Sequence, residues 1–290
     1  MTTKKIILSL AVTLLLSSCV AKSYYQVYQT QSKEKMQRDH NSLIYSDANC
    51  TIFYNFWSDG GNIGFTIRND SEQNIYLNKK ECFFICNGYA YDYFQNRIYT
   101  NTRGLQVGAA AAKSGAAGIA VSGVNVYGYD QTNSVAATKS YGVSVANNVS
   151  NSVSWEEAEI ICIPPKTAKV ISEFEKITNT VIRNCDLFQY PTDKQTNSST
   201  FSEADSPLVF CNKLAYRLGD SEDLIRIDNE FCVSEIKNLT EKNMIETKGF
   251  EEFCGEKIEL LTPKRYWKED APDKFYIRYT RTAEYYKIKH

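Results

Sequence analysis

The sequence predicts a mostly β protein, built as an antiparallel β-sandwich. Its 290 residues include 20 Tyr and 14 Phe, and aromatic residues are enriched in strands. Short apolar or alternating runs are separated by Gly, Asp and Asn turn signals. No stretch longer than about two turns keeps helical apolar spacing, and residues 241–253 are the best helix candidate.

Residues 1–18 are expected to be a signal peptide. Lys4 and Lys5 precede the uncharged segment 6–16, which is shorter than the roughly 20 residues that cross a bilayer. Leu16-Ser17-Ser18-Cys19 resembles a bacterial lipobox. The resemblance implies cleavage before Cys19, a diacylglyceryl group on its thiol and acylation of the new amine, for example with palmitate. The alternative is an ordinary secretory signal with a chance cysteine.

Two or three acyl chains are enough for stable anchoring. Val20-Ala21-Lys22 lacks an acidic residue after the cysteine, which favours the outer membrane. Whether the protein faces the periplasm or the cell surface stays open. Residues 19–40 are then expected to form a lipidated tether and a first strand. The strand is indicated by residues 25–30, in which apolar and polar side chains alternate.

Residues 41–182 are expected to form the sandwich domain. Turn signals at Asp59-Gly60-Gly61 and Asn87-Gly88 permit the positive φ angles of tight hairpins. The strands expected here are 50–57, 62–68, 75–77, 82–86, 89–94, 158–163 and 168–174. Pro164-Pro165, between the last two, resembles the late part of an immunoglobulin-like sandwich.

Residues 183–290 predict a β-rich C-terminal region, either separate or part of the same domain. Its strand candidates are 207–218, 224–227, 231–236 and 275–279.

The segment 104–154 interrupts this pattern, because only Lys113, Asp130 and Lys139 are charged among its Gly, Ala, Ser, Val and Asn residues. The small residues of 104–118 resemble those that allow two helices to pack closely. In 143–145 and 149–155, apolar and polar residues alternate, as in a strand with one apolar and one polar face. A surface loop is the simpler interpretation. An amphipathic hairpin that inserts into a membrane is the alternative.

Eight cysteines follow Cys19, and their even number in an exported chain permits a disulfide framework of undetermined pairing. Buried thiols acting as small hydrophobic residues are the alternative. The eight are Cys50, Cys82, Cys86, Cys162, Cys185, Cys211, Cys232 and Cys254.

Catalytic, metal and cofactor motifs are absent from the sequence. It has no Cys-x-x-Cys pair, no P-loop, no Gly-x-Ser-x-Gly elbow and only two histidines, His40 and His290. We therefore expect no catalytic residues, no metal site and no cofactor. The net charge of −1 argues against a nucleic-acid partner.

Four aromatic residues beside the hairpin turns are the candidate ligand-binding residues. Tyr54, Trp57, Tyr89 and Tyr91 are of the types that contact sugars or anchor protein partners. Cross-strand and core packing is the alternative role.

The body is also similar to a group of lipoproteins from gut Bacteroidota, through segments 23–28, 54–58, 87–94 and 163–165. This resemblance implies a lipoprotein and no particular activity. We expect a lipid-anchored, non-enzymatic protein of the cell envelope that contacts a protein or glycan partner. The alternative is a membrane-active protein whose segment 104–154 penetrates a bilayer or oligomerises.

Overall fold

The computed structural model describes residues 22–105, 149–174, 176–195 and 198–281. Within them the chain divides into two units, one of residues 22–93 and 160–281 and one of residues 94–159. The fold is mostly β and antiparallel, as predicted. Cys19 and the part of the insert between residues 106 and 148 lie outside the described residues.

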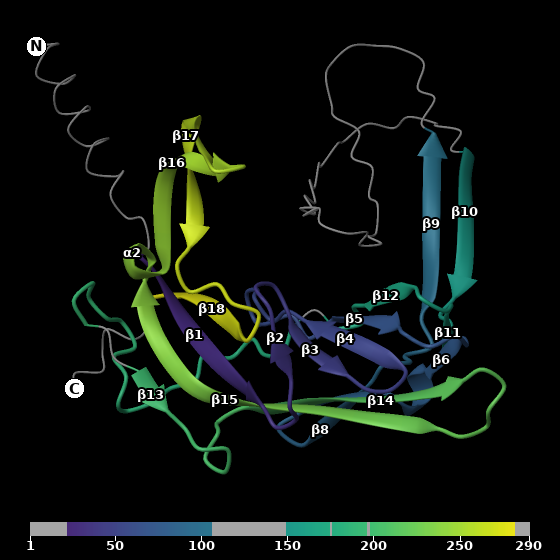
Figure 1. Ribbon diagram of the computed structural model, residues 1–290. Coiled ribbons are helices and arrows are strands. Elements are labelled where there is room, and N and C mark those ends of the chain that lie inside the picture. Colours follow the sequence, from purple (N-terminus) through teal and green to yellow (C-terminus); the bar gives the residue numbers. More distant parts are fainter. Residues whose placement is uncertain (1–21, 106–148, 175, 196–197, 282–290) are drawn as a thin grey trace, which may run out of the picture. The chain divides into compact units, whose positions relative to one another are not determined.

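The first unit is built around a nine-stranded antiparallel sheet that curls along its length (Figure 1). Its main strand order is β11-β6-β14-β15-β1-β18. β7 pairs with β14 and β8, and β13 pairs with β15. The strands are β1 (Ser23–Ser32), β6 (Ile75–Asn78), β7 (Phe83–Cys86), β8 (Tyr89–Asp92), β11 (Ile160–Ile163), β13 (Ser198–Thr200), β14 (Val209–Leu218), β15 (Ile225–Thr240) and β18 (Lys274–Thr280).

A five-stranded sheet of order β12-β5-β4-β3-β2 packs against it. Its strands are β2 (Gln37–Arg38), β3 (Leu43–Ser46), β4 (Cys50–Tyr54), β5 (Phe65–Asn69) and β12 (Ala168–Ile171). Their inward residues and those of the large sheet form one apolar cluster. The ring of Phe56 lies 4.8 Å from that of Phe231, and Tyr28 stacks on Phe275 at 4.5 Å. Such aromatic pairs add to the free energy of area burial.

The first strand, predicted from the alternation of residues 25–30, is confirmed and is longer than predicted. Residues 23–32 form β1, which lies between β15 and β18 in the large sheet. Gln26 is fully buried, and its side-chain amide donates to the carbonyl of Ile182 and to Asn238 Oδ1, at 2.8 and 2.9 Å. Because these partners satisfy the polar group, a strand with a polar sequence can be buried.

The C-terminal region belongs to the same domain as the sandwich. β14, β15 and β18 are neighbours of β6 and β1 in the large sheet. The two strands expected at 224–227 and 231–236 are one continuous strand, β15.

The predicted turn at Asn87-Gly88 is confirmed, whereas Asp59-Gly60-Gly61 lies within a longer connection, residues 55–64, between the paired strands β4 and β5. Asn87 and Gly88 have φ angles of 45° and 84° and join β7 to β8. Gly60 and Gly61, at 87° and 79°, lie between β4 and β5. A Cβ added to Gly61 would lie 2.7 Å from Ile177 Cδ1, so a side chain there would also clash with the core.

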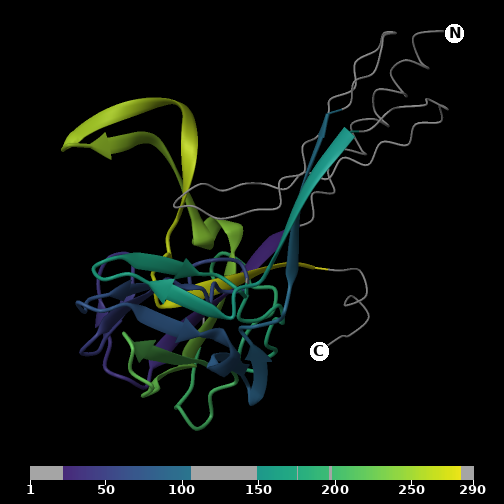
Figure 2. The ribbon, with the colours of Figure 1, turned by 90° about the vertical axis from the view of Figure 1, so that its right-hand side faces the viewer.

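The helix expected over 241–253 is wrong beyond its first turn. The helix α2 covers only Glu241–Met244, and the chain continues as β16 (Ile245–Phe253), which pairs with β17 (Glu256–Trp267). Their register shifts at Gly249, and the hairpin curves (Figure 2). Gly249 would weaken a helix, whereas the partner strand β17 supplies backbone hydrogen bonds. The only other helical element among the described residues is η1 (Lys79–Glu81).

The second unit contains an antiparallel ribbon of β9 (Ile98–Leu105) and β10 (Val149–Glu156). The strand predicted from the alternation of residues 149–155 is thus confirmed, whereas residues 143–145 lie outside the described residues. Glu157, whose side chain is 1% exposed, follows β10. Its carboxylate accepts from the backbone N–H groups of Gln95 and Arg97, both at 3.0 Å, and pairs with the Arg97 guanidinium at 3.1 Å.

All eight cysteines that follow Cys19 are free thiols. Cys50, Cys82, Cys211 and Cys232 are buried, which agrees with the role of small hydrophobic residues. No group of three or more potential metal ligands occurs among the described residues. In the same part of the chain, no helix has the length and apolarity needed to span a bilayer.

Candidate functional site: a polar groove beside Trp57

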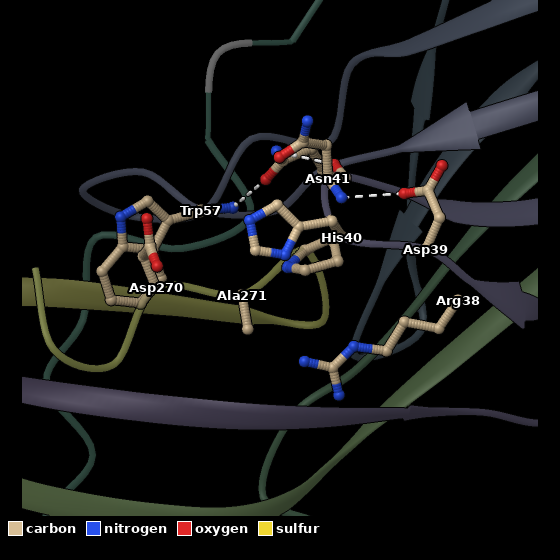
Figure 3. Close-up of a pocket in the computed structure, with 9 residues that line it drawn as sticks. Arg38, Asp39, His40, Asn41, Trp57, Asp270 and Ala271 are labelled. Atoms are coloured by element: carbon tan, nitrogen blue, oxygen red, sulfur yellow. Dashed lines mark hydrogen bonds between the residues drawn. The ribbon is translucent and has the colours of Figure 1, made fainter. Parts of the chain in front are cut away.

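A groove of about 340 Å³ opens where three segments of the first unit meet (Figure 3). The segments are the β2–β3 turn, the chain that leaves β4, and the chain that enters β18. Most of their lining side chains are polar or charged, and Trp57 supplies the aromatic surface. The lining residues are Arg38, Asp39, His40, Asn41, Asn55, Trp57, Asp270, Ala271 and Pro272.

The β2–β3 turn is held by the side chain of Asp39. Its Oδ1 accepts from the backbone N–H of Asn41 at 2.8 Å and from that of Ser42 at 2.6 Å. An aspartate that bonds to the backbone two residues ahead fixes a tight turn. The turn therefore presents His40 and Asn41 on a defined backbone.

Asn55 joins this turn to the chain after β4. Its side-chain amide donates to the carbonyl of Asn41 at 2.9 Å, and its side-chain oxygen accepts from the backbone N–H of Trp57 at 2.9 Å (Figure 3). Both groups of the amide are thus used within the protein. We infer that Asn55 positions the groove more than it offers free hydrogen bonds to a ligand.

The third segment, residues 270–273, is held by contacts to the chain after β4 and to the strands β1 and β2. The backbone N–H of Phe56 donates to the carbonyl of Pro272 at 2.9 Å. Arg38 Nη1 pairs with Asp273 Oδ2 at 2.8 Å, and the Asp273 carbonyl accepts from the backbone N–H of Thr30 at 2.9 Å. These contacts connect segment 270–273 to β1 and β2, so the three walls belong to one body.

Trp57 is braced by a second aromatic cluster. Its ring lies 5.1 Å from Tyr276 and 5.9 Å from Trp267. This cluster packs against Tyr25 and Met244. The indole is partly exposed, so it offers a ligand a rigid aromatic surface with little ordering cost.

Unsatisfied polar atoms concentrate around this place. Four side-chain atoms among the described residues are buried without a hydrogen-bond partner, and three of them are Trp57 Nε1, Ser58 Oγ and Asp273 Oδ1. Such atoms are uncommon in native proteins, and each costs about 1–3 kcal/mol. All three residues line the groove or directly adjoin a lining residue, so the protein bears this cost around one site.

The groove suits a ligand with many hydroxyl or amide groups. Asp39 and Asp270 carry carboxylate acceptors, whereas Arg38 and the side-chain amide of Asn41 carry donors. Figure 3 shows Trp57 and Asp270 on one side of His40, with Asp39 and Arg38 on the other. This arrangement provides both hydrogen-bond acceptors and hydrogen-bond donors around an aromatic face.

The four candidate aromatic residues do not form one site. Trp57 lines the groove, whereas Tyr54 is fully buried and donates from its hydroxyl to Asn229 Oδ1 at 2.8 Å. Tyr54 is therefore a core residue, inaccessible to a ligand. Tyr89 and Tyr91 lie on β8, 72% and 47% exposed, and neither lines the groove. Tyr91 stacks on Phe84 at 5.9 Å.

The other groove residues were missed because they come from three segments far apart in sequence. The Asp39-His40-Asn41 turn and Asn55 were locally recognisable as polar residues beside strands. Nothing local connects them to Asp270. The pairing of β1 with β18, together with the contacts of Phe56 and Arg38, brings that segment to the β2–β3 turn.

The chain matches no protein-family model, no curated protein and no solved structure with which it was compared.

Proposed function

We propose that this chain is a lipid-anchored, non-enzymatic binding protein of a bacterial cell envelope and that its groove takes a glycan. The observation that carries the glycan assignment is the groove itself. It combines the rigid face of Trp57 with charged and amide side chains from three segments.

Sugars present an apolar C–H face and a rim of hydroxyl groups. An aromatic ring covers the first, and carboxylates, amides and guanidinium groups bond to the second. The groove is open and polar, which suits one or two sugar units at the end of a chain better than a buried apolar cofactor. A protein partner is the other class of ligand, and the experiment below separates the two.

The test is a screen of the soluble body, residues 20–290, against immobilised envelope glycans. Trp57→Ala should lower the affinity for any glycan that binds by at least tenfold, because it removes the aromatic face. Tyr89→Ala is the matched control, since it removes an aromatic side chain that is more exposed and lies outside the groove. Equal binding by both variants, or no glycan bound by the intact protein, would contradict the assignment.

The anchor is tested separately. Cells that express the full chain should incorporate labelled palmitate into it, and Cys19→Ala should abolish this incorporation. Cys185→Ala is the control, because Cys185 is an exposed cysteine elsewhere in the chain. Labelling that persists in Cys19→Ala would refute lipidation at this residue.

A membrane-active insert is the second candidate. The observation in its favour is the β9–β10 ladder, which remains paired up to Leu105 and Val149 on either side of the insert. If the insert penetrates bilayers, the intact soluble body should release dye from vesicles, and deletion of residues 106–148 should stop the release. Absence of release by the intact body would refute this candidate.

A further inference from the structure

We propose that the end of the first unit at which β1 begins is a membrane-docking face, seated directly on the anionic phospholipid headgroups. This inference rests on the proposed acylation of Cys19. It adds a fixed orientation of the first unit, which places the end of this unit opposite the docking face away from the bilayer.

The first argument is the length of chain between anchor and fold. Ser23, four residues after Cys19, is already buried and paired in β1. Four residues span at most about 14 Å when fully extended. An anchored body therefore cannot stand away from the membrane, and the residues around Ser23 must lie close to the headgroups.

The second argument is that a pinned loop presents an aromatic side chain at this end. The loop of residues 183–195 lies beside the beginning of β1, where Tyr190 contacts Tyr24 at a ring distance of 5.3 Å. Asn238 Nδ2 donates to the carbonyl of Phe188 at 3.1 Å, and Thr240 Oγ1 donates to Asp193 Oδ1 at 2.6 Å. The loop is fixed, yet the side chain of Phe188 is 55% exposed.

The tyrosines of this end are of the kind found at membrane interfaces. Tyr24, Tyr190 and Tyr279 form one cluster, with Tyr24 and Tyr279 stacked at 5.7 Å. Arg281 lies over the ring of Tyr190 at 5.2 Å, and Lys22 over that of Tyr24 at 5.5 Å. Aromatic rings with adjacent Lys and Arg are typical of the headgroup region.

The third argument is charge. The mature chain has a net charge of −3, because removal of Lys4 and Lys5 subtracts two positive charges from −1. The contacts around the beginning of β1 show the reverse. Four cations lie there, Lys22, Lys242, Arg278 and Arg281, against two carboxylates, those of Asp59 and Asp193. Glu241 and Arg265 pair with each other beside this face. Local positive charge on an acidic protein suits anionic lipid headgroups.

The test uses the mature acylated chain in vesicles of phosphatidylethanolamine and phosphatidylglycerol that contain a headgroup nitroxide lipid. A polarity-sensitive fluorophore on Cys185, in the Cys254→Ser variant, reports on the docking face. The control fluorophore is placed by Glu222→Cys in a Cys185→Ser, Cys254→Ser variant. Residue 222 lies in the turn between β14 and β15, just before the start of β15 (Figure 1). The other end of β15 pairs with Tyr24, so residue 222 and the docking face lie at opposite ends of this strand.

We expect the nitroxide lipid to quench the fluorophore at Cys185 at least threefold more strongly than the one at residue 222. Phe188→Asp should reduce the quenching at Cys185 by at least half. Ile160→Asp, a change at a 49% exposed residue of β11, should leave it unchanged. Melting curves of both variants verify that each is folded.

Flotation of the vesicles separates failure of the anchor from failure of the docking face. Protein that does not float with the vesicles would refute acylation, and the docking face with it. Protein that floats but shows equal quenching at both positions would overturn the docking face alone.

Discussion

Tyr54→Phe tests whether this aromatic residue belongs to the core, as the structure shows, or contributes to a ligand surface. The change removes one oxygen atom and keeps the ring packed against Phe65 and Phe231. Any loss of stability therefore comes from the hydrogen bonds of the hydroxyl group, which donates to Asn229 and also bonds to the side chain of Asn212.

The magnitude follows from the surroundings of Asn229. Both residues are fully buried, and Asn229 Nδ2 already lacks a partner among the described residues. Without the Tyr54 hydroxyl, the side chain of Asn229 loses its bond at Oδ1 as well. Leaving a buried amide unpaired costs about 1–3 kcal/mol. At about 2–4 °C per kcal/mol for a domain of this size, Tm should fall by about 2–12 °C.

The assay is urea unfolding followed by circular dichroism, with a double-mutant cycle as control. In the Asn229→Leu background the bond to Asn229 is absent and only the partner Asn212 remains, so Tyr54→Phe should cost about 1 kcal/mol less than in the native background. A loss below about 0.5 kcal/mol in the native background, or an equal loss in both, would refute the assignment of this bond.

Three further predictions address the strand β1, the β9–β10 ribbon and the buried thiols. Val27→Asp should unfold the body or lower its stability by more than about 3 kcal/mol, because Val27 is a 3% exposed residue of β1; Lys35→Asp, at an exposed residue, should change Tm little, and similar melting of the two variants would contradict the burial of β1. Glu157→Gln should raise the hydrogen-exchange rates of β9 and β10 amides by about 10-fold or more, because charge-assisted bonds contribute about 1.5–3 kcal/mol; unchanged rates would show that the carboxylate does not stabilise the ribbon. Burial raises the pKa of Cys82 to about 11 and that of Cys211 to about 12, from an ordinary 9.0. Since the folded state holds these protons more tightly, this contribution to stability is complete below pH 9 and is lost between pH 9 and the folded pKa, about 11 for Cys82 and about 12 for Cys211, by at most about 1.4 kcal/mol per pH unit for each thiol; a urea midpoint that stays constant from pH 8 to 11 would contradict this.

The sequence allowed the fold class and several hairpins to be predicted, because their signals are local. Asn87-Gly88 determines its turn through positive φ angles, whatever the rest of the chain does. The strand β1 was predicted, but its central and buried place in the large sheet was not. Its glutamines and serines give no local sign of burial until Asn238 and Ile182 are known to be partners of Gln26.

The hairpin β16–β17 illustrates a second limit. Residues 241–253 were the best helix candidate in the sequence, and Thr240 does cap a helical turn by accepting from the Asn243 N–H. The strand conformation is preferred over the helix because β17 pairs with β16 along most of its length. Propensity within one segment carries no information about a partner strand.

The candidate site was predicted only through Trp57. Aromatic residues beside turns look alike in sequence, and burial separates Tyr54 from Trp57 only in three dimensions. Asp270 joins the site through backbone bonds from Thr30 and Phe56 to its neighbours, Asp273 and Pro272. Such long-range bonds leave no local pattern.

The most direct test of glycan binding in the groove is a nuclear magnetic resonance titration of the indole N–H signals. The chain has three tryptophans, Trp57, Trp155 and Trp267, so three signals are expected, and Trp57→Phe identifies the first. We predict that a bound glycan shifts the Trp57 signal saturably and leaves that of Trp155 in place. A glycan that binds without moving the Trp57 signal would contradict the account.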